Sequence, residues 1–137
     1  QELDNVIVAC NSILHQVVTK TLPPLNRNRI EELNRVVLDK LLVEEGVVPG
    51  QVRTYSVGVA NYRGAPAEDC AYLLDHLCQW LNGHGFEAPP SQEIAYAILK
   101  SVISHLYLAW IHPFGDGNGR TARLIEFQIL IASGVPA

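Results

Sequence analysis

The sequence predicts a mainly α-helical protein, a helical bundle that carries one short β-hairpin. Apolar residues recur at helical spacing in five segments, each long enough to form a helix. Residues 51–63 differ: they are rich in β-branched and aromatic residues, with breaks at Gly58 and Gly64, which is typical of short strands. A chain of 137 residues is long enough to bury a core. We therefore expect a single domain over residues 1–137.

The first three predicted helices each present one apolar face, over residues 3–20, 26–42 and 66–82. Asn26 or Asn28 is suited to cap the second helix, because its side chain can accept a hydrogen bond from a free N–H group of the first turn. The hairpin is expected between the second and third helices, over about residues 50–64.

The fourth helix is predicted over residues 91–111, which are apolar on nearly every side. A helix of this kind is expected in the middle of the bundle. Pro113 ends it, and a proline disfavours the helical conformation in the residue before it. We therefore expect His112 to leave the helix in an extended conformation, at the mouth of a loop.

Residues 112–123 (HPFGDGNGRTAR) concentrate the chemistry of the chain: an imidazole, a carboxylate, three glycines, an amide and two guanidinium groups. The fifth helix is predicted from Arg120 to Ser133, with Gly134 as its stop and Pro136 just beyond. The Gly-Asn-Gly step thus lies at a helix N-terminus. Free N–H groups and the helix dipole favour an anion there, above all a phosphate.

Charged residues complete this predicted anion site. Arg120 and Arg123 lie three residues apart on one helix face and extend the site to further phosphates. Asp116 offers the hard oxygen ligand that suits Mg²⁺. Together with His112 as a base, these groups are what phosphoryl or nucleotidyl transfer requires. A Walker A loop needs Lys-Ser/Thr after its glycines, and the dinucleotide fingerprint follows a strand, so neither fits.

Residues 112–123 match the signature H-x-F-x-[D/E]-G-N-G-R-x-x-R at every specified position, so the chain resembles the Fic domain family. The resemblance covers most of the chain and includes a flap-like segment after Pro49-Gly50 and a helix end at Trp80-Leu81-Asn82. It implies a Fic-like helical bundle. The flap would span about residues 50–64, and the signature loop and helix would span residues 112–133.

The resemblance implies a role for each residue of the motif. His112 would be the general base that takes a proton from a target hydroxyl, and an imidazole suits that task near neutral pH. Phe114 would anchor the loop in the core, and Asp116 would coordinate Mg²⁺ on the phosphates of ATP. The implied phosphate-binding residues are Gly117, Asn118, Gly119, Arg120 and Arg123. Among these, the Asn118 side chain would also lie near the phosphates, and Arg123 would hold the γ-phosphate.

The implied reaction transfers AMP from ATP to a Ser, Thr or Tyr hydroxyl of a target protein and releases pyrophosphate. The target would dock on the flap by adding a strand to its open edge; the alternative is that the flap only closes one end of the bundle. Other implied activities are transfer from another nucleotide or a phosphocholine donor, phosphotransfer, and removal of AMP. A non-catalytic nucleotide-binding module is the alternative from a different class.

Many members of this family carry an inhibitory helix of the form [S/T]-x-x-x-E-[G/N], whose glutamate pairs with the second arginine of the motif. Glu45-Gly46 is a poor match, because Leu41 stands where Ser or Thr belongs. We expect any inhibitory helix to lie outside this segment or on an inhibitory partner. The sequence begins at Gln1 without Met and ends just after the motif helix, so we expect it to be a fragment.

Net charge and cysteine spacing limit the classes of partner and the compartment that we expect. A net charge of −4 argues against nucleic acid, which usually binds a basic face. No segment is expected to span a membrane. The three cysteines form no C-x-x-C pair or zinc pattern, which favours free thiols in a reducing, cytoplasmic compartment.

Overall fold

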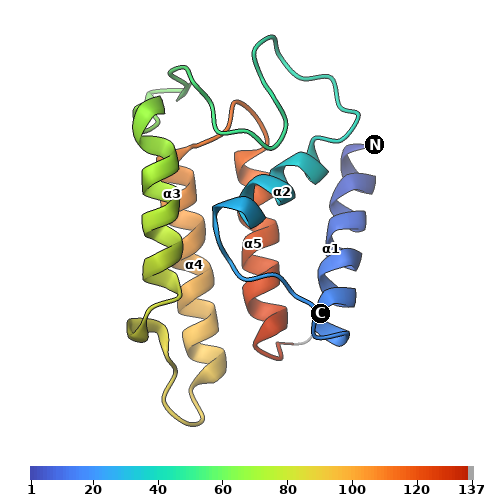
Figure 1. Cartoon of the computed structure of the whole chain (residues 1–137), viewed down its shortest axis with the longest axis vertical. Coiled ribbons are helices and arrows are strands. Elements are labelled where there is room, and N and C mark those ends of the chain that lie inside the picture. Colours follow the sequence, from blue (N-terminus) through green and yellow to red (C-terminus); the bar gives the residue numbers. More distant parts are fainter. Residues whose placement is uncertain (136–137) are drawn as a thin grey trace.

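The computed structural model describes residues 1–135, and these form a bundle of α-helices with one short hairpin at its end (Figure 1). The helices are α1 (Glu2–Val18), α2 (Arg27–Val37), α3 (Ala67–Leu81), α4 (Glu93–Ile111) and α5 (Asn118–Ala132). A short 3₁₀ helix, η1 (His84–Phe86), follows α3. The prediction of a mainly α-helical fold with a short hairpin is confirmed. Pro136, expected just beyond the last helix, lies outside the described residues.

The helix in the middle of the bundle is α5, which packs against α1, α2 and α4 (Figure 1). Its side chains are buried on most sides, with Leu124 and Ile125 each 2% exposed. The expectation that residues 91–111 occupy the middle is therefore wrong. An apolar pattern shows that a helix can be surrounded, but here both α4 and α5 carry such a pattern, and only α5 has neighbours on enough sides.

α4 packs between α3 and α5 and leaves a third side uncovered. Its buried side carries small residues, Ala97, Ser101 and Ser104, which let α5 approach closely. Its outer face is apolar and about half exposed; it includes Ile94, Ile98, Leu99, Val102 and Trp110. Within the described residues, α4 is long and apolar enough to cross a membrane by length and composition, which corrects the expectation that no segment is.

The start of α2 confirms one of the two predicted caps. The Asn26 side chain accepts a hydrogen bond of 2.9 Å from the N–H of Arg29. α2 ends at Val37 rather than at residue 42. The chain reverses just beyond it, where Lys40 adopts a left-handed conformation with φ 56°.

The flap, residues 50–64, crosses the end of the bundle where α4 ends and α5 begins (Figure 1). Its hairpin is shorter than predicted: β1 (Gly58–Val59) pairs antiparallel with β2 (Tyr62–Arg63), and all four residues are exposed. The hydroxyl of Tyr62 donates to the Trp110 carbonyl and ties the hairpin to the end of α4. The flap and the signature motif therefore share one end of the molecule.

Candidate active site

His112 caps the C-terminus of α4 in a left-handed conformation, with φ 50° and ψ 58°. The expectation of an extended His112 is wrong, although Pro113 does end the helix at that point. The His112 N–H still donates to the Leu108 carbonyl at 2.9 Å, and its own carbonyl accepts from Arg53 Nε at 2.7 Å. These two bonds fix the reversal. A left-handed residue other than glycine costs on the order of 1–2 kcal/mol, so the surrounding contacts must hold it in place.

The His112 imidazole is half buried and lines a cavity of about 320 Å³ at the start of α5. Burial lowers the pKa of this imidazole; a hydrogen bond with the Ala109 backbone opposes that shift, and the positive charge of Arg53 adds to it. The net direction is downward from 6.5. At neutral pH the ring is therefore neutral and able to accept a proton.

The N-terminus of α5, which begins one residue after Gly117, also lines this cavity. Gly117 is the N-cap, with φ 76°, and its carbonyl accepts the first helical bond from the N–H of Thr121. The N–H groups of residues 118–120 precede that bond and remain free of intrahelical partners. Added to the helix dipole, they form the kind of cradle that binds phosphate.

The Asn118 side chain forms hydrogen bonds within the signature loop. It is 6% exposed and turned back into the loop, where its amide donates to the Phe114 carbonyl at 2.8 Å and accepts from the Phe114 N–H at 3.0 Å. Phe114 itself is 1% exposed. These bonds fix the shape of the loop that carries His112 and Asp116, and Asn118 also lines the cavity.

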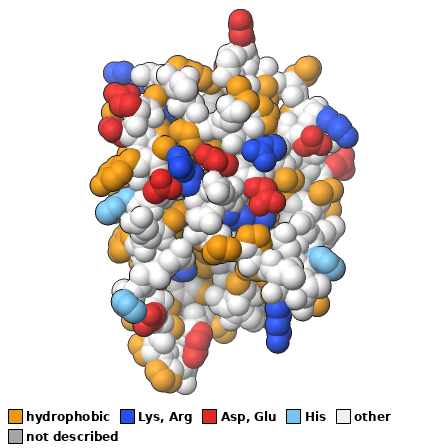
Figure 2. Space-filling view, in the orientation of Figure 1, with side chains coloured by type: hydrophobic (Ala, Val, Ile, Leu, Met, Phe, Trp, Pro, Cys, Tyr) orange, Lys and Arg blue, Asp and Glu red, His pale blue; other side chains and the backbone are white. Residues whose placement is uncertain are grey.

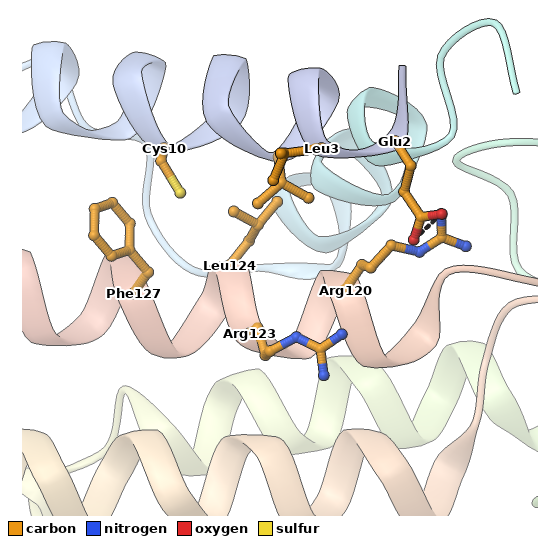
Figure 3. Close-up of a pocket in the computed structure, with 8 residues that line it drawn as sticks. Glu2, Leu3, Cys10, Arg120, Arg123, Leu124 and Phe127 are labelled. Atoms are coloured by element: carbon orange, nitrogen blue, oxygen red, sulfur yellow. Dashed lines mark ion pairs between the residues drawn. The ribbon is translucent and has the colours of Figure 1, made fainter.

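Arg120 lies between two carboxylates. One guanidinium nitrogen is 2.9 Å from Asp116 Oδ1, and another is 3.3 Å from Glu2 Oε1 at the start of α1 (Figure 3). The Arg120 side chain is 15% exposed, whereas that of Glu2 is 65% exposed. Sequence reasoning missed Glu2, which is separated from the motif by more than a hundred residues and carries no local signal of its role.

Arg123 also lines the cavity, and within residues 1–135 it forms no ion pair. Glu126, one turn further along α5, pairs instead with His105 of α4, at 3.1 Å. An ion pair between Arg123 and Glu126 along α5 would be a purely structural explanation of Arg123, and the structure does not show that pair. Its guanidinium points toward the same end of α5 as that of Arg120 (Figure 3).

A second, apolar pocket of about 520 Å³ adjoins the cavity between α1 and α5 (Figure 3). Arg120, Arg123 and Glu2 belong to both hollows, and the remaining lining residues are Leu3, Val6, Cys10, Leu124 and Phe127. Although this pocket is larger, its lining includes neither the His112 imidazole nor the free N–H groups at the start of α5. Those groups line the smaller, polar cavity.

Two carboxylates, those of Asp116 and Glu2, line this cavity, and both are ion-paired with Arg120. Among the described residues, no cluster of three or more His, Cys, Asp or Glu side chains could hold an ion alone. Asp116 uses Oδ1 to accept from Arg120 and from the Gly117 N–H, and Oδ2 has no partner in the described part of the chain. This arrangement fits Mg²⁺, which is commonly held by one or two carboxylates while substrate phosphates and water complete its shell.

Two buried polar side chains outside the motif support it, and sequence reasoning missed both. Asn34 of α2 is fully buried; it donates to the Asp116 carbonyl at 3.0 Å and accepts from the Gly50 N–H at 2.9 Å. It thereby connects α2, the start of the flap and the signature loop. Arg53 of the flap is 4% exposed and contacts the His112 carbonyl. No sequence period marks either residue, because both act through contacts made in the fold.

Comparison with known proteins shows the family of the chain. The sequence model of the Fic/DOC family matches residues 24–130. The chain is 32% identical over 120 residues to the protein adenylyltransferase fic-1 of Caenorhabditis elegans, and 37% identical over 108 residues to the protein adenylyltransferase Fic of Drosophila persimilis. These matches cover 88% and 78% of the chain. The chain therefore belongs to the Fic/DOC family.

Solved structures show the same fold. The Fic domain containing signaling protein of Bacteroides thetaiotaomicron matches with a TM-score of 0.72 and 27% identity, over 98% of this chain and 48% of its own. Fic-1 of C. elegans, residues 134–508, matches with a TM-score of 0.70 and 28% identity, over 95% of this chain and 37% of its own. The chain spans about a fifth of the length of the curated relatives, 22% of the C. elegans protein and 19% of the D. persimilis protein.

Proposed function

We propose that this protein is a nucleotidyltransferase that moves AMP from Mg-ATP to a hydroxyl group of a target protein. One observation carries the proposal: a single cavity is lined both by a half-buried imidazole, His112, and by the free N-terminus of α5. The imidazole can remove a proton, and the helix terminus can hold phosphates. The relatives named protein adenylyltransferase support the same class of reaction.

In the proposed reaction the target's hydroxyl oxygen bonds to the α-phosphorus of ATP, and the bond from that phosphorus to the oxygen bridging the β-phosphorus breaks. Pyrophosphate leaves, and His112 takes the hydroxyl proton. The N–H groups of residues 118–120 hold the phosphates, and Arg120 and Arg123 balance their charge. Asp116 would hold Mg²⁺, which would neutralise further phosphate charge. Burial lowers the pKa of His112, so its ring is neutral near neutral pH and can accept the hydroxyl proton.

We propose further that the target docks on the flap as an added strand. Both strands of the hairpin are exposed, and an exposed edge offers unpaired N–H and C=O groups to another chain. Backbone pairing makes few demands on the target sequence. It would place a hydroxyl-bearing residue at the end of the bundle that also carries His112.

The proposed cradle would hold the phosphates and not the nucleobase, so it also fits other nucleoside triphosphates. The alternatives within this fold are another nucleotide or phosphocholine donor, or the removal of AMP; a module that binds nucleotide without catalysis is the alternative outside it. Each predicts a different mass change on the target, so one measurement separates them.

The test is intact-mass analysis of candidate target proteins after incubation with the full chain, Mg²⁺ and each nucleoside triphosphate in turn. We expect an increase by one AMP with ATP, abolished in His112→Ala and preserved in the control His84→Ala. His84 is 96% exposed, in the short helix after α3, and does not line the cavity. Calorimetric binding of Mg-ATP without any mass change on targets, in wild type and His112→Ala alike, would establish the non-catalytic module instead.

A further inference from the structure

Arg53 is a buried charge that the proposed chemistry does not use. It is 4% exposed and lies in the flap, yet it does not line the cavity that holds His112 and the start of α5. A buried guanidinium needs several good hydrogen-bond acceptors, because desolvation of an unpaired charge is costly. The acceptors that Arg53 has found indicate what it does.

The guanidinium of Arg53 donates to backbone carbonyls from three separate segments. Nε donates to His112 O at 2.7 Å and Nη1 to Tyr55 O at 2.7 Å; Nη2 donates to Ala65 O, with Ile111 O at 3.3 Å. In addition, its backbone N–H donates to Pro113 O at 2.9 Å. Tyr55 lies early in the flap and Ala65 directly follows it, while the other acceptors belong to the turn that carries the imidazole.

Only arginine can make this set of contacts. Its planar fork presents five N–H donors in fixed directions, and hydrogen bonds from a charged donor are stronger than neutral ones. A lysine carries the same charge on a compact ammonium group and cannot reach three separate segments at once.

Gly64 shows how tightly these parts are packed. A Cβ atom at Gly64 would lie 3.0 Å from Nη2 of Arg53 and 3.1 Å from Cβ of His112. The end of the flap therefore packs closely against both the Arg53 guanidinium and the Cβ atom of His112. Neither the flap nor the left-handed turn at His112 can shift without disturbing the other.

We propose that Arg53 is a positioning residue, which fixes the left-handed turn at His112 and both ends of the flap relative to each other. It thereby sets the distance between the base and a hydroxyl presented on the flap. The inference rests on the proposed function in so far as the hydroxyl docks there. The positioning itself is a property of the fold and can be measured without catalysis.

The test compares Arg53→Lys and Arg53→Met with the matched controls Arg63→Lys and Arg63→Met in the full chain. Arg63 is also a flap arginine, but it is exposed and its guanidinium bonds only to Ser56 among the described residues. Three quantities are measured for each variant: kcat for AMP transfer, the Kd of Mg-ATP, and the NMR signals of the His112 ring and of the flap amides.

We expect Arg53→Lys to lower kcat on the order of 10–100-fold, as a shift of about 1 Å at a reacting group does. The Kd of Mg-ATP should stay within about threefold, because the cradle on α5 is untouched. The His112 signals should shift in Arg53→Lys and remain in place in both Arg63 variants, in which only flap amides next to residue 63 should shift. In Arg53→Met, where the positive charge is also lost, the pKa of His112 should rise, since that charge lowers it.

Arg53→Met leaves several carbonyls without a donor and is the variant most exposed to unfolding. Gly64→Ala provides an independent route, because it keeps the guanidinium and crowds both Arg53 and His112. It should reproduce the loss of kcat and the shifted His112 signals.

Wild-type kcat and unshifted His112 signals in Arg53→Lys would overturn the inference. An equal loss of kcat and of Mg-ATP affinity would overturn it too, because that pattern indicates general damage. If the wild type transfers no AMP, the proposed function fails, and the NMR signals alone then decide the positioning role.

Discussion

Arg120, a predicted phosphate ligand on α5, is ion-paired with Glu2 of α1 at 3.3 Å. The Glu2 carboxylate thus lies against the wall of the cavity where a nucleotide's phosphates are expected, and it lines the cavity itself. A carboxylate and a phosphate compete for the same guanidinium. Because the Glu2 side chain is 65% exposed, this competition should be modest.

Glu2→Gln should therefore tighten the binding of Mg-ATP. An exposed ion pair contributes about 0.2–1 kcal/mol, so we expect a Kd lower by roughly 1.5- to 5-fold at low ionic strength, with the gain shrinking as salt is added. Titration calorimetry measures both. Glu87→Gln, a change at an exposed carboxylate near η1, serves as the control and should leave the Kd unchanged. Weaker binding in Glu2→Gln would contradict the competition.

The pH dependence of transfer should report the lowered pKa of His112. Burial disfavours the charged imidazole, so the pKa in the folded protein lies below 6.5. A general base must be neutral to act, so kcat/KM should rise with pH along a limb centred below 6.5 and then level off near neutrality. A limb centred at or above 6.5 in the pH profile of the free enzyme would show that this pKa is not lowered.

Gly117→Ala should abolish the phosphate cradle, and Gly134→Ala is its matched control. Gly117 has φ 76°, and an added Cβ would lie 3.0 Å from the Asn34 amide nitrogen. Gly134 has φ 86°, and an added Cβ there would meet no atom within 4 Å among the described residues. Both alanine variants should lose on the order of 1 kcal/mol of folding free energy from the left-handed backbone.

Only Gly117→Ala should also lose affinity for Mg-ATP, because its added methyl group pushes against the residue that holds the loop. Chemical denaturation and titration calorimetry separate the two effects. Wild-type nucleotide affinity in Gly117→Ala would mean that the start of α5 does not hold the phosphates.

The buried amide of Asn34 should contribute measurably to the free energy of folding. Asn34→Ala removes the donor to Asp116 O and leaves the Gly50 N–H without a partner, which should cost about 1–3 kcal/mol of folding free energy. Asn11→Ala, at an exposed position of α1, should be neutral or slightly stabilising. Urea denaturation of the two variants gives the comparison. Equal stabilities would show that Asn34 does not hold the flap and the loop together.

The fold class and the motif could be predicted from the sequence because both depend on patterns within short stretches of residues. Helical periodicity shows in short windows, and the whole motif lies within twelve consecutive residues, 112–123. Which apolar helix occupies the middle could not be decided that way. Both α4 and α5 are apolar enough to be buried on all sides, and the packing of the other helices decides which of them is central.

The conformation of His112 and its supports were beyond sequence reasoning for a related reason. The rule for residues before proline disfavours the right-handed helix and favours extended backbone, but it takes no account of the tertiary contacts that select a left-handed conformation here. That choice follows from the carbonyl contact with Arg53, which lies 59 residues away in the sequence. Glu2 and Asn34 act over comparable or longer separations. A single sequence carries no period or spacing that would reveal them.

The most direct test of the central claim is a crystal structure of the full chain with Mg²⁺ and a non-hydrolysable ATP analogue. The account predicts phosphates on the N–H groups of residues 118–120, with the metal on Asp116 and the His112 ring facing the α-phosphorus. An analogue whose phosphates lie away from the start of α5, for example in the apolar pocket between α1 and α5, would contradict it.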